Sequence, residues 1–406
     1  MQMPKPISLT VFLGNENTLR KWDARGSFVR ELKLYRHLQE RGLEISLVSF
    51  GGSEELDYAS QLPGMRILCN RVGLPERTYI RRIHQIHAGA ILRSDVVRTH
   101  QTGGILAAMK ANWAWQVPLI ARMDYDWSKN LRTNEPENTV EHSRVDGLVR
   151  KALARADHVI VTTEEIASTM VGKVPSVASK LTVIPNFVDT HTFRPASLEK
   201  RYDLVYIGRL ASIKNLDALY EALSRLDRSL AVISGSISPD RENASASARS
   251  EQLRKRYGDL HQRVRWIGRV QNEDVPPYLN QARAFILCSL REGHPRSMVE
   301  AMACGLPIIG TNVAGIGSLL KHEVTGYLCD TDADSIACAI EAVLSNPALM
   351  RKMGANARQF ALEHFALEQI AQREYDLLQH VVTMNPVAGA PKRFAQYFLR
   401  RNPGWT

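Results

Sequence analysis

The sequence predicts an α/β protein made of two doubly wound domains, each a parallel sheet with helices on both faces. Short runs rich in Val, Ile and Leu alternate with longer segments of helical periodicity throughout the 406 residues. This alternation stops once, at a segment punctuated by prolines, and then restarts. The length fits two or three domains at roughly 150 residues each. Two strand series separated by one linker indicate two sheets rather than one large sheet.

The first half of the chain contains the first strand series and one clear helix. In the helix predicted for residues 27–41, Phe28, Leu32, Tyr35 and Leu38 recur at helical spacing, and a glycine follows the last turn. The strands predicted for this half cover residues 7–13, 44–50, 65–69, 95–99, 118–122, 158–162 and 181–184.

The linker runs from Ile184-Pro185-Asn186 to Phe193-Arg194-Pro195, where prolines interrupt any regular element. We therefore predict an N-terminal domain over residues 1–190 and a C-terminal domain over residues 191–375. The strands predicted for the second domain cover residues 202–208, 230–234, 264–267, 284–288, 307–310 and 326–328. Because ligands of such sheets bind at the carboxyl ends of the strands, we expect a site in a cleft between the two domains.

The remaining residues, 376–406, form a basic tail. Lys392, Arg393, Arg400 and Arg401 are interleaved with aromatic residues. Two interpretations remain open for this tail. It packs back on the N-terminal domain as a helix, or it lies on a membrane surface.

Composition excludes several classes of protein. Lys and Arg number 52 against 42 Asp and Glu, a formal net charge of +10, which attracts nucleic acid, acidic lipid headgroups or phosphorylated small molecules. No apolar run approaches the roughly 18–20 residues that span a bilayer. Residues 7–13 are apolar but short, and they predict a strand rather than a signal peptide. The five cysteines are scattered without a CxxC pair, which favours reduced, buried cysteines in a cytoplasmic protein.

The most specific segment for chemistry is residues 289–307. A predicted strand ends before it, a loop with Gly293 and Pro295 follows, and a helix begins near Ser297. The unpaired N–H groups of such a helix start favour a bound phosphate. Glu292 and Glu300 stand eight positions apart, and carboxylates in this setting accept hydrogen bonds from sugar hydroxyls. On spacing alone, an alternative remains: Glu300 is an ordinary surface glutamate, and Glu292 is a carboxylate at the start of a helix.

A second segment joins a buried strand to two cations. Tyr202–Ile207 is followed by Gly208 and Arg209, and Lys214 comes five residues later at the start of a helix. Arg209 can bind a diphosphate with both arms of its guanidinium, and Lys214 can add a point charge.

These segments together resemble the retaining glycosyltransferases of family 4, which have the two-domain GT-B fold. The resemblance rests on Glu292-x7-Glu300 followed by Ala301-Met302-Ala303-Cys304-Gly305-Leu306-Pro307, and on Gly208-Arg209-Leu210 with Lys214-Asn215. The linker and the segment 156–162 are similar to those of the family as well. The first 120 residues match in pattern only.

The resemblance implies a role for each matching position. Arg209 and Lys214 would bind the diphosphate of a nucleotide-sugar donor, and Glu292 would contact the hydroxyls of the transferred sugar. Glu300 would hold the ribose. The other donor-binding positions are Gly26 at the diphosphate, Ser234 and Gly235 beside the nucleotide, Arg269 and Val270 along the base, and Gly293, His294, Arg296 and Ser297 around the distal phosphate.

Three positions differ from the family pattern or are ambiguous. Pro295 replaces a glycine and has no N–H to donate, so His294 or Arg296 would compensate. Asp124 stands after the fifth strand where many members have a histidine. It would orient a sugar hydroxyl or stabilise a cationic centre, or it is a helix N-cap. His100 ends a strand and would touch the acceptor, or it is simply solvated or hydrogen-bonded.

We expect no metal and no other cofactor. Asp124-Tyr125-Asp126 and Asp330-Thr331-Asp332 each spell a DxD, but such three-residue matches are common. Arg209 and Lys214 would supply the charge neutralisation that a divalent cation provides elsewhere.

The predicted function is transfer of a sugar, with retention, from a nucleotide-diphosphate sugar to a glycan or lipid-linked acceptor in cell-surface polysaccharide or lipopolysaccharide synthesis. The alternatives are a sugar-nucleotide 2-epimerase of the same fold and a basic nucleic-acid-binding protein, although no nucleic-acid partner is expected. A dinucleotide dehydrogenase lacks its G-x-G-x-x-G after the first strand. Basic residues of the first domain, with the tail, predict contact with an anionic inner membrane face. They are Arg77, Arg81, Arg82, Arg93, Arg98 and Lys110.

Overall fold

The computed structural model describes residues 6–134, 137–234, 251–253, 255–256, 260 and 262–385. The chain divides into two compact units. The first comprises residues 1–22, 33–184 and 371–406, and the second comprises residues 23–32 and 185–370. The two units divide after residues 184 and 370, six and five residues before the predicted boundaries at 190 and 375. The short segment 23–32, which joins the second unit, had no counterpart in the sequence prediction.

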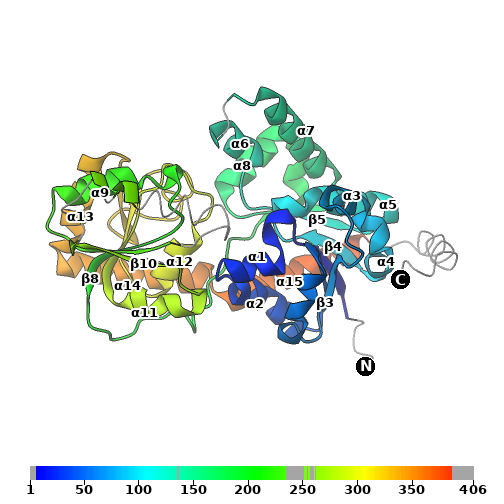
Figure 1. Ribbon diagram of the computed structural model, residues 1–406, viewed down its shortest axis with the longest axis horizontal. Helices are drawn as coiled ribbons and strands as arrows, with labels where there is room; N and C mark the ends of the chain where they lie inside the picture. Colours follow the sequence, from blue (N-terminus) through cyan, green and yellow to red (C-terminus); the bar gives the residue numbers. More distant parts are fainter. Residues whose placement is uncertain are drawn as a thin grey trace. The chain divides into compact units, whose positions relative to one another are not determined.

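The first unit contains a seven-stranded parallel sheet in the order β3-β2-β1-β4-β5-β6-β7 (Figure 1). Its central strands are apolar on both faces, because helices cover both sides. The strands are β1 (Ser8–Phe12), β2 (Glu44–Gly52), β3 (Arg66–Asn70), β4 (Val96–Thr99), β5 (Leu119–Met123), β6 (His158–Val161) and β7 (Leu181–Val183).

Side chains at the helix starts help to set where the helices of this region begin. Asp126, Asn138 and Thr163 each accept a backbone N–H in the first turn of α6, α7 and α8, respectively. The helices are α1 (Leu19–Ala24), α2 (Phe28–Glu40), α3 (Glu76–Ile86), α4 (Ala88–Arg93), α5 (Ile105–Trp115), α6 (Trp127–Asn134), α7 (Thr139–Arg155), α8 (Glu164–Lys173) and α15 (Leu367–Met384).

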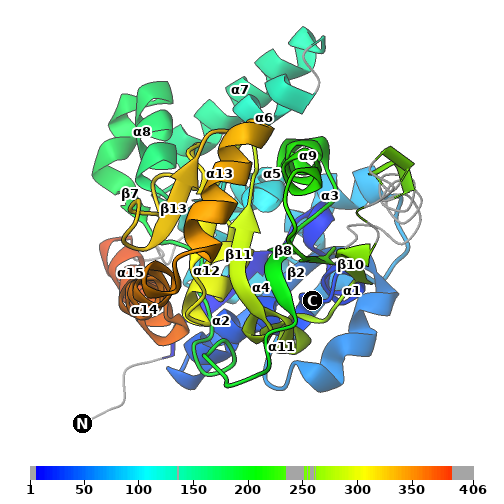
Figure 2. The ribbon, with the colours of Figure 1, turned by 90° about the vertical axis from the view of Figure 1, so that its left-hand side faces the viewer.

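The second unit contains a six-stranded parallel sheet in the order β10-β9-β8-β11-β12-β13. Figure 2 shows β8 and β11 side by side in this sheet, with α9 and α13 next to one another. The strands are β8 (Tyr202–Ile207), β9 (Leu230–Ile233), β10 (Val264–Gly268), β11 (Ala282–Leu287), β12 (Ile308–Thr311) and β13 (Gly326–Cys329). The helices are α9 (Leu216–Ser224), α11 (Val275–Asn280), α12 (Arg296–Ala303), α13 (Ala333–Leu344) and α14 (Pro347–His364).

The prediction of two doubly wound sheets is confirmed, and every predicted strand is present with its ends shifted by at most two residues. The predicted helix 27–41 is α2. Residues 376–384, the start of the predicted tail, continue α15, and the rest of the tail from 386 onward lies outside the described residues. The expectation for the cysteines needs correction. The cysteines are buried except Cys338, which is exposed because Ile336 and Ala339 occupy the inner face of α13.

None of the described helices is both long and apolar enough to cross a bilayer.

Candidate functional site

One ion pair of the second unit joins two predicted site residues. Lys214 Nζ lies 2.5 Å from Glu292 Oε1, and both side chains are largely buried, 14% and 12% exposed. Lys214 closes the short 3-10 turn Ser212–Lys214 that follows β8, whereas Glu292 follows β11, the strand paired with β8. Because both residues follow the carboxyl ends of adjacent parallel strands, the sheet itself brings them together.

The loop that carries Glu292 is fixed on both sides. The Glu292 N–H donates to the Ala314 carbonyl at 3.0 Å, and Ser289 Oγ donates to Glu292 Oε1 at 2.6 Å. Leu290 N–H donates to the carbonyl of Ile213, one residue before Lys214, at 2.8 Å. A Cβ at Gly315, where φ is +79°, would overlap the Glu292 carbonyl oxygen, so the close approach of these two loops requires glycine.

Arg209 is the second predicted diphosphate ligand, and its side chain is exposed. Its backbone carbonyl accepts a hydrogen bond from the hydroxyl of Tyr206 at 2.7 Å. Burial raises the pKa of Tyr206 well above its usual value, so this phenol keeps its proton and remains a donor. Among the described residues, no carboxylate or carbonyl holds the Arg209 guanidinium, which leaves it available to an anion.

Glu300, the predicted ribose ligand, is buried and already hydrogen-bonded. Asn272 Nδ2 donates to Glu300 Oε1 at 2.8 Å, and an Arg30 nitrogen lies 3.5 Å from the same oxygen. Burial raises the pKa of Glu300, while Arg30, Asn272 and Arg296 oppose that rise. The alternative of an ordinary surface glutamate is therefore wrong, because α12 turns this carboxylate inward.

At the start of α12, the side chains of the two residues expected to compensate for Pro295 contact other parts of the protein. Arg296, expected to compensate for the missing N–H of Pro295, forms an ion pair with Glu31 at 2.7 Å. The buried ring of His294 packs edge-on against Phe365, with ring centroids 5.0 Å apart. Its carbonyl accepts a hydrogen bond from Asn186 at 3.0 Å. The two predicted substitutes for the glycine amide are thus engaged with the protein itself.

The remaining donor-side positions gather around the end of β10. Arg269 donates to the carbonyls of Asp23 and Ala24, and Val270 packs against the core of the unit. The carbonyl of Gly26 accepts the N–H of Asn272 at 2.9 Å, and φ of Gly26 is +68°. Gly26 therefore lies against the segment predicted to follow the base.

Three donor-side positions remain, and the structure describes two of them. Ser234 donates its N–H to the Gly268 carbonyl at 3.1 Å. Gly235 lies outside the described residues, and Ser297 is half-buried in the first turn of α12.

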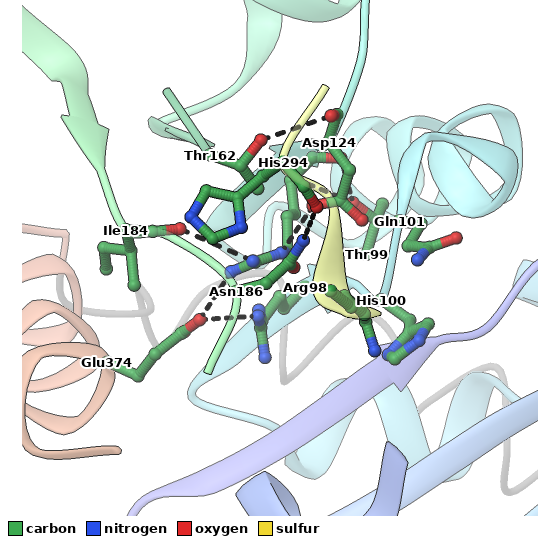
Figure 3. A network of polar contacts seen from close by, with 12 residues as sticks. Arg98, Thr99, His100, Gln101, Asp124, Thr162, Ile184, Asn186, His294 and Glu374 are labelled. Carbon is green, nitrogen blue, oxygen red and sulfur yellow. Dashed lines mark hydrogen bonds and ion pairs between the residues drawn. The ribbon is translucent and has the colours of Figure 1, made fainter. Parts of the chain in front are cut away.

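In the first unit, a buried ionic network lies around Asp124 (Figure 3). Glu374 Oε1 lies 2.8 Å from a guanidinium nitrogen of Arg98 and 2.8 Å from one of Arg122. Arg122 Nε in turn donates to Asp124 Oδ1 at 2.8 Å, and another of its nitrogens donates to the Ile184 carbonyl at 3.4 Å. Asp124 is therefore held by an arginine that a glutamate of α15 neutralises.

Two of these network residues were missed or misassigned from the sequence. Arg98 was expected on a basic surface but is only 1% exposed, because it lies within the buried strand β4. Glu374 is fully buried and was not singled out as a site residue. The sequence did contain a signal for this network. Arg98 is a charged residue inside an apolar strand, and a buried charge needs a buried partner of opposite charge.

Asp124 itself is a buried carboxylate with one oxygen unoccupied. Its Oδ1 accepts from Arg122, whereas Oδ2 has no hydrogen-bond partner among the described residues. The N-cap alternative for Asp124 is wrong, because Asp126 Oδ1 accepts the Lys129 N–H in the first turn of α6.

His100, the predicted acceptor contact, is buried at the end of β4. Its Nδ1 lies 2.6 Å from the Tyr35 hydroxyl, and its ring centroid lies 4.8 Å from that of Trp22. The structure thus corresponds to the hydrogen-bonded alternative for this histidine.

Neither DxD segment gathers into a cation site. Across the described residues, no group of three or more His, Cys, Asp or Glu side chains is placed to hold a metal ion. Asp126 caps α6, and Asp332 caps α13 through the Ser335 N–H at 2.8 Å.

Several known proteins resemble the chain. YtcC of Bacillus subtilis is 26% identical over 62% of this chain, which spans 66% of that protein. The D-inositol 3-phosphate glycosyltransferase of Xylanimonas cellulosilytica is 25% identical over 90% of this chain and 94% of its own length. One component of the human phosphatidylinositol N-acetylglucosaminyltransferase is 30% identical over 48% of this chain and 40% of its own length.

Solved structures share the fold at low sequence identity. Sucrose-phosphate synthase from Thermosynechococcus elongatus superposes with a TM-score of 0.78 at 20% identity, over 93% of this chain and all of that chain. Anabaena HepE in complex with UDP-glucose gives 0.71 at 16% identity, over 92% of this chain and all of that chain.

Two family models match adjoining parts of the sequence. Residues 26–192 match the model described as Glycosyltransferase Family 4, and residues 188–360 match the model described as Glycosyl transferases group 1. Together they extend from residue 26 to residue 360, and the chain therefore belongs to the family 4 glycosyltransferases of the GT-B fold.

Proposed function

We propose that this protein transfers a sugar, with retention of anomeric configuration, from a nucleotide-diphosphate sugar to a glycan or lipid-linked acceptor. The observation that carries the proposal is the Lys214–Glu292 pair, together with the exposed Arg209, which follows the same strand β8 as Lys214. A cation and a carboxylate side by side at the ends of β8 and β11 match a ligand that has both phosphates and sugar hydroxyls.

In the proposed mechanism, the enzyme stabilises charge and fixes orientation. As the bond between the sugar and the diphosphate breaks, negative charge grows on the diphosphate, and Arg209 and Lys214 stabilise that charge. Glu292 accepts hydrogen bonds from sugar hydroxyls and holds the ring in place. The leaving diphosphate takes the proton of the acceptor hydroxyl while the acceptor oxygen bonds to the anomeric carbon from the same face.

Asp124 has the chemistry for a second contact with the sugar. Its buried Oδ2 can accept a hydrogen bond from a hydroxyl or lie near positive charge on the ring. Arg122, which donates to Oδ1, holds the carboxylate in place for this contact.

The proposal requires no metal, because two cations of the chain serve the diphosphate. Added Mg²⁺ or a chelator should then leave the transfer rate unchanged. A rate that falls more than tenfold in EDTA, and recovers with a divalent cation, would contradict this part.

The nature of the donor and acceptor is supported by relatives rather than by contacts. UDP is the first nucleotide to test, because the HepE structure of this fold holds UDP-glucose. A lipid-linked acceptor agrees with the name of the human relative, which belongs to a phosphatidylinositol N-acetylglucosaminyltransferase. We place the reaction in cell-surface polysaccharide or lipopolysaccharide synthesis, at the inner face of the cytoplasmic membrane.

A thermal-shift screen with UDP, GDP and ADP should identify the nucleotide, because a ligand of the folded state alone raises the melting temperature. With the donor known, Lys214→Ala should abolish transfer and leave the melting temperature of the unliganded protein nearly unchanged. Full activity in that variant would refute the mechanism. The anomeric configuration of the product, read by NMR, tests retention. An epimerised free sugar without a glycosylated acceptor would instead support the 2-epimerase.

A further inference from the structure

One surface of the first unit contains the arginines of α3, which the sequence predicts to contact an anionic membrane face. We call it the α3–α5 face, because it comprises exposed residues of these two helices and of the turn before α3. Its members are Val72, Arg77, Arg81, Arg82, Leu106 and Trp113.

The apolar part of this face is a stripe along α5. Leu106, Met109, Lys110 and Trp113 recur at spacings of three and four residues, so they lie on one side of the helix. Trp113 is 67% exposed and Leu106 is 43% exposed. The opposite side, with alanines at 107, 108 and 111, is buried against the sheet. On α5, Trp113 and Leu106 are therefore exposed, although a soluble helix usually turns such large apolar side chains toward the core.

The basic part lies on α3, which packs directly against α5. Trp115 Nε1 donates to the His84 carbonyl at 2.7 Å, and Lys110 Nζ reaches the Arg81 carbonyl at 3.5 Å. Figure 1 shows α3, α4 and α5 close together at one end of the sheet. The two hydrogen bonds hold the exposed arginines of α3 next to the apolar stripe.

These arginines are not neutralised locally. Arg77, Arg81 and Arg82 are exposed, and within the described parts of the chain none of them forms an ion pair. Glu76 is the one acidic residue of α3, and Arg93 adds a further exposed charge at the end of α4. The face therefore combines uncompensated positive charge with exposed Trp, Leu and Val.

We propose that the α3–α5 face binds an anionic lipid surface, with Trp113 and Leu106 entering the interface and the arginines contacting the headgroups. A nucleic acid would use the charge but not the aliphatic side chains, whereas an anionic bilayer matches both. This inference deepens the proposed function by naming the surface that would meet the membrane. It concerns binding alone and is tested without turnover.

The test is co-sedimentation of the full-length protein with vesicles. One set is pure phosphatidylcholine, and the other contains about one third phosphatidylglycerol. We expect binding to the anionic vesicles, weak binding to the neutral ones, and a loss of affinity at high salt. Each arginine near an anionic surface contributes roughly a fivefold factor, so the triple variant Arg77→Gln, Arg81→Gln, Arg82→Gln should bind on the order of 100-fold more weakly.

Matched variants separate this face from general charge and hydrophobicity. Trp113→Ala should lower the affinity several-fold, whereas Leu198→Ala, at a 40% exposed apolar position of the second unit, should not. The double variant Arg351→Gln, Lys352→Gln, on the exposed side of α14, controls for net charge. The melting temperatures of all these variants should equal that of the parent protein, because each side chain is exposed.

Three results would overturn the inference. The first is equal binding by the parent protein and the triple variant. The second is vesicle binding that persists in the triple variant and in Trp113→Ala but disappears when the chain is cut after residue 385. That result would assign the binding to the basic tail. The third is a dimer in solution that Trp113→Ala dissociates, which would make the face a protein interface. Lys214→Ala should bind vesicles like the parent protein, so a failure of vesicle binding is distinguishable from a failure of the proposed catalysis.

Discussion

The substitution Glu374→Gln tests whether the buried ionic network holds the first unit together. Glu374 is fully buried, Arg98 is 1% exposed, and one carboxylate oxygen lies 2.8 Å from both Arg98 and Arg122. Gln keeps the shape but removes the charge, which leaves Arg98 with no carboxylate partner. Removal of one partner from a buried ion pair costs about 3–5 kcal/mol. At about 2–4 °C per kcal/mol, the unfolding transition of this unit should fall by roughly 6–20 °C.

The assay is thermal and urea unfolding followed by circular dichroism, without ligand. Since the network lies within the first unit, one transition should move and the other should remain in place. Glu141→Gln is the matched control, because Glu141 forms an exposed pair with Arg144 on α7 and should cost less than about 1 kcal/mol. If Glu374→Gln costs no more than that control, the reasoning fails, and the arginines must be compensated in another way.

Three further predictions concern single positions. Gly315→Ala should cost about 1 kcal/mol or more and lower kcat, because its left-handed φ and the overlap with the Glu292 carbonyl disfavour a side chain; unchanged kcat would contradict this. Burial raises the pKa of Glu300 in the folded protein. The free energy of unfolding should therefore fall as the pH rises from about 4.5, the pKa of an unfolded glutamate, through the raised pKa of the folded state. Glu300→Gln should flatten that slope in urea titrations across pH, and an unchanged slope would refute it. Asp126→Ala should cost about 1 kcal/mol through its lost cap without slowing transfer, whereas Asp124→Ala should slow it; equal kcat values would remove Asp124 from the mechanism.

The elements of the fold could be predicted because their signals are local. Each strand is a short apolar run, and helix α2 has a periodicity that ends at a glycine. The exchange of residues 23–32 to the second unit could not be predicted. It rests on contacts such as Gly26 with Asn272 and Arg30 with Glu300, which join positions about 250 residues apart. No periodicity in the chain encodes such pairs.

The candidate site divides in the same way. Lys214 and Glu292 were both identified, because each follows a strand end and parallel strands bring their ends to one edge. Their direct contact at 2.5 Å, and the role of Ser289 in holding Glu292, depend on loop geometry that the motif does not contain. The packing of His294 against Phe365 and the ion pair of Arg296 with Glu31 could not be predicted either, because these partners lie far away in the sequence.

The distribution of the basic residues shows why a charge count needs the structure. The excess of +10 treats every arginine alike, but Arg98 and Arg122 are neutralised in the core by Glu374 and Asp124. Such arginines contribute to stability and add nothing to the field outside the protein. The arginines of α3 precede Arg98 by 16 to 21 residues in the sequence, yet they are exposed and without ion pairs among the described residues. Because a field at the surface depends on uncompensated exposed charge, the attraction to an anionic surface should follow the arginines of α3 and not the total.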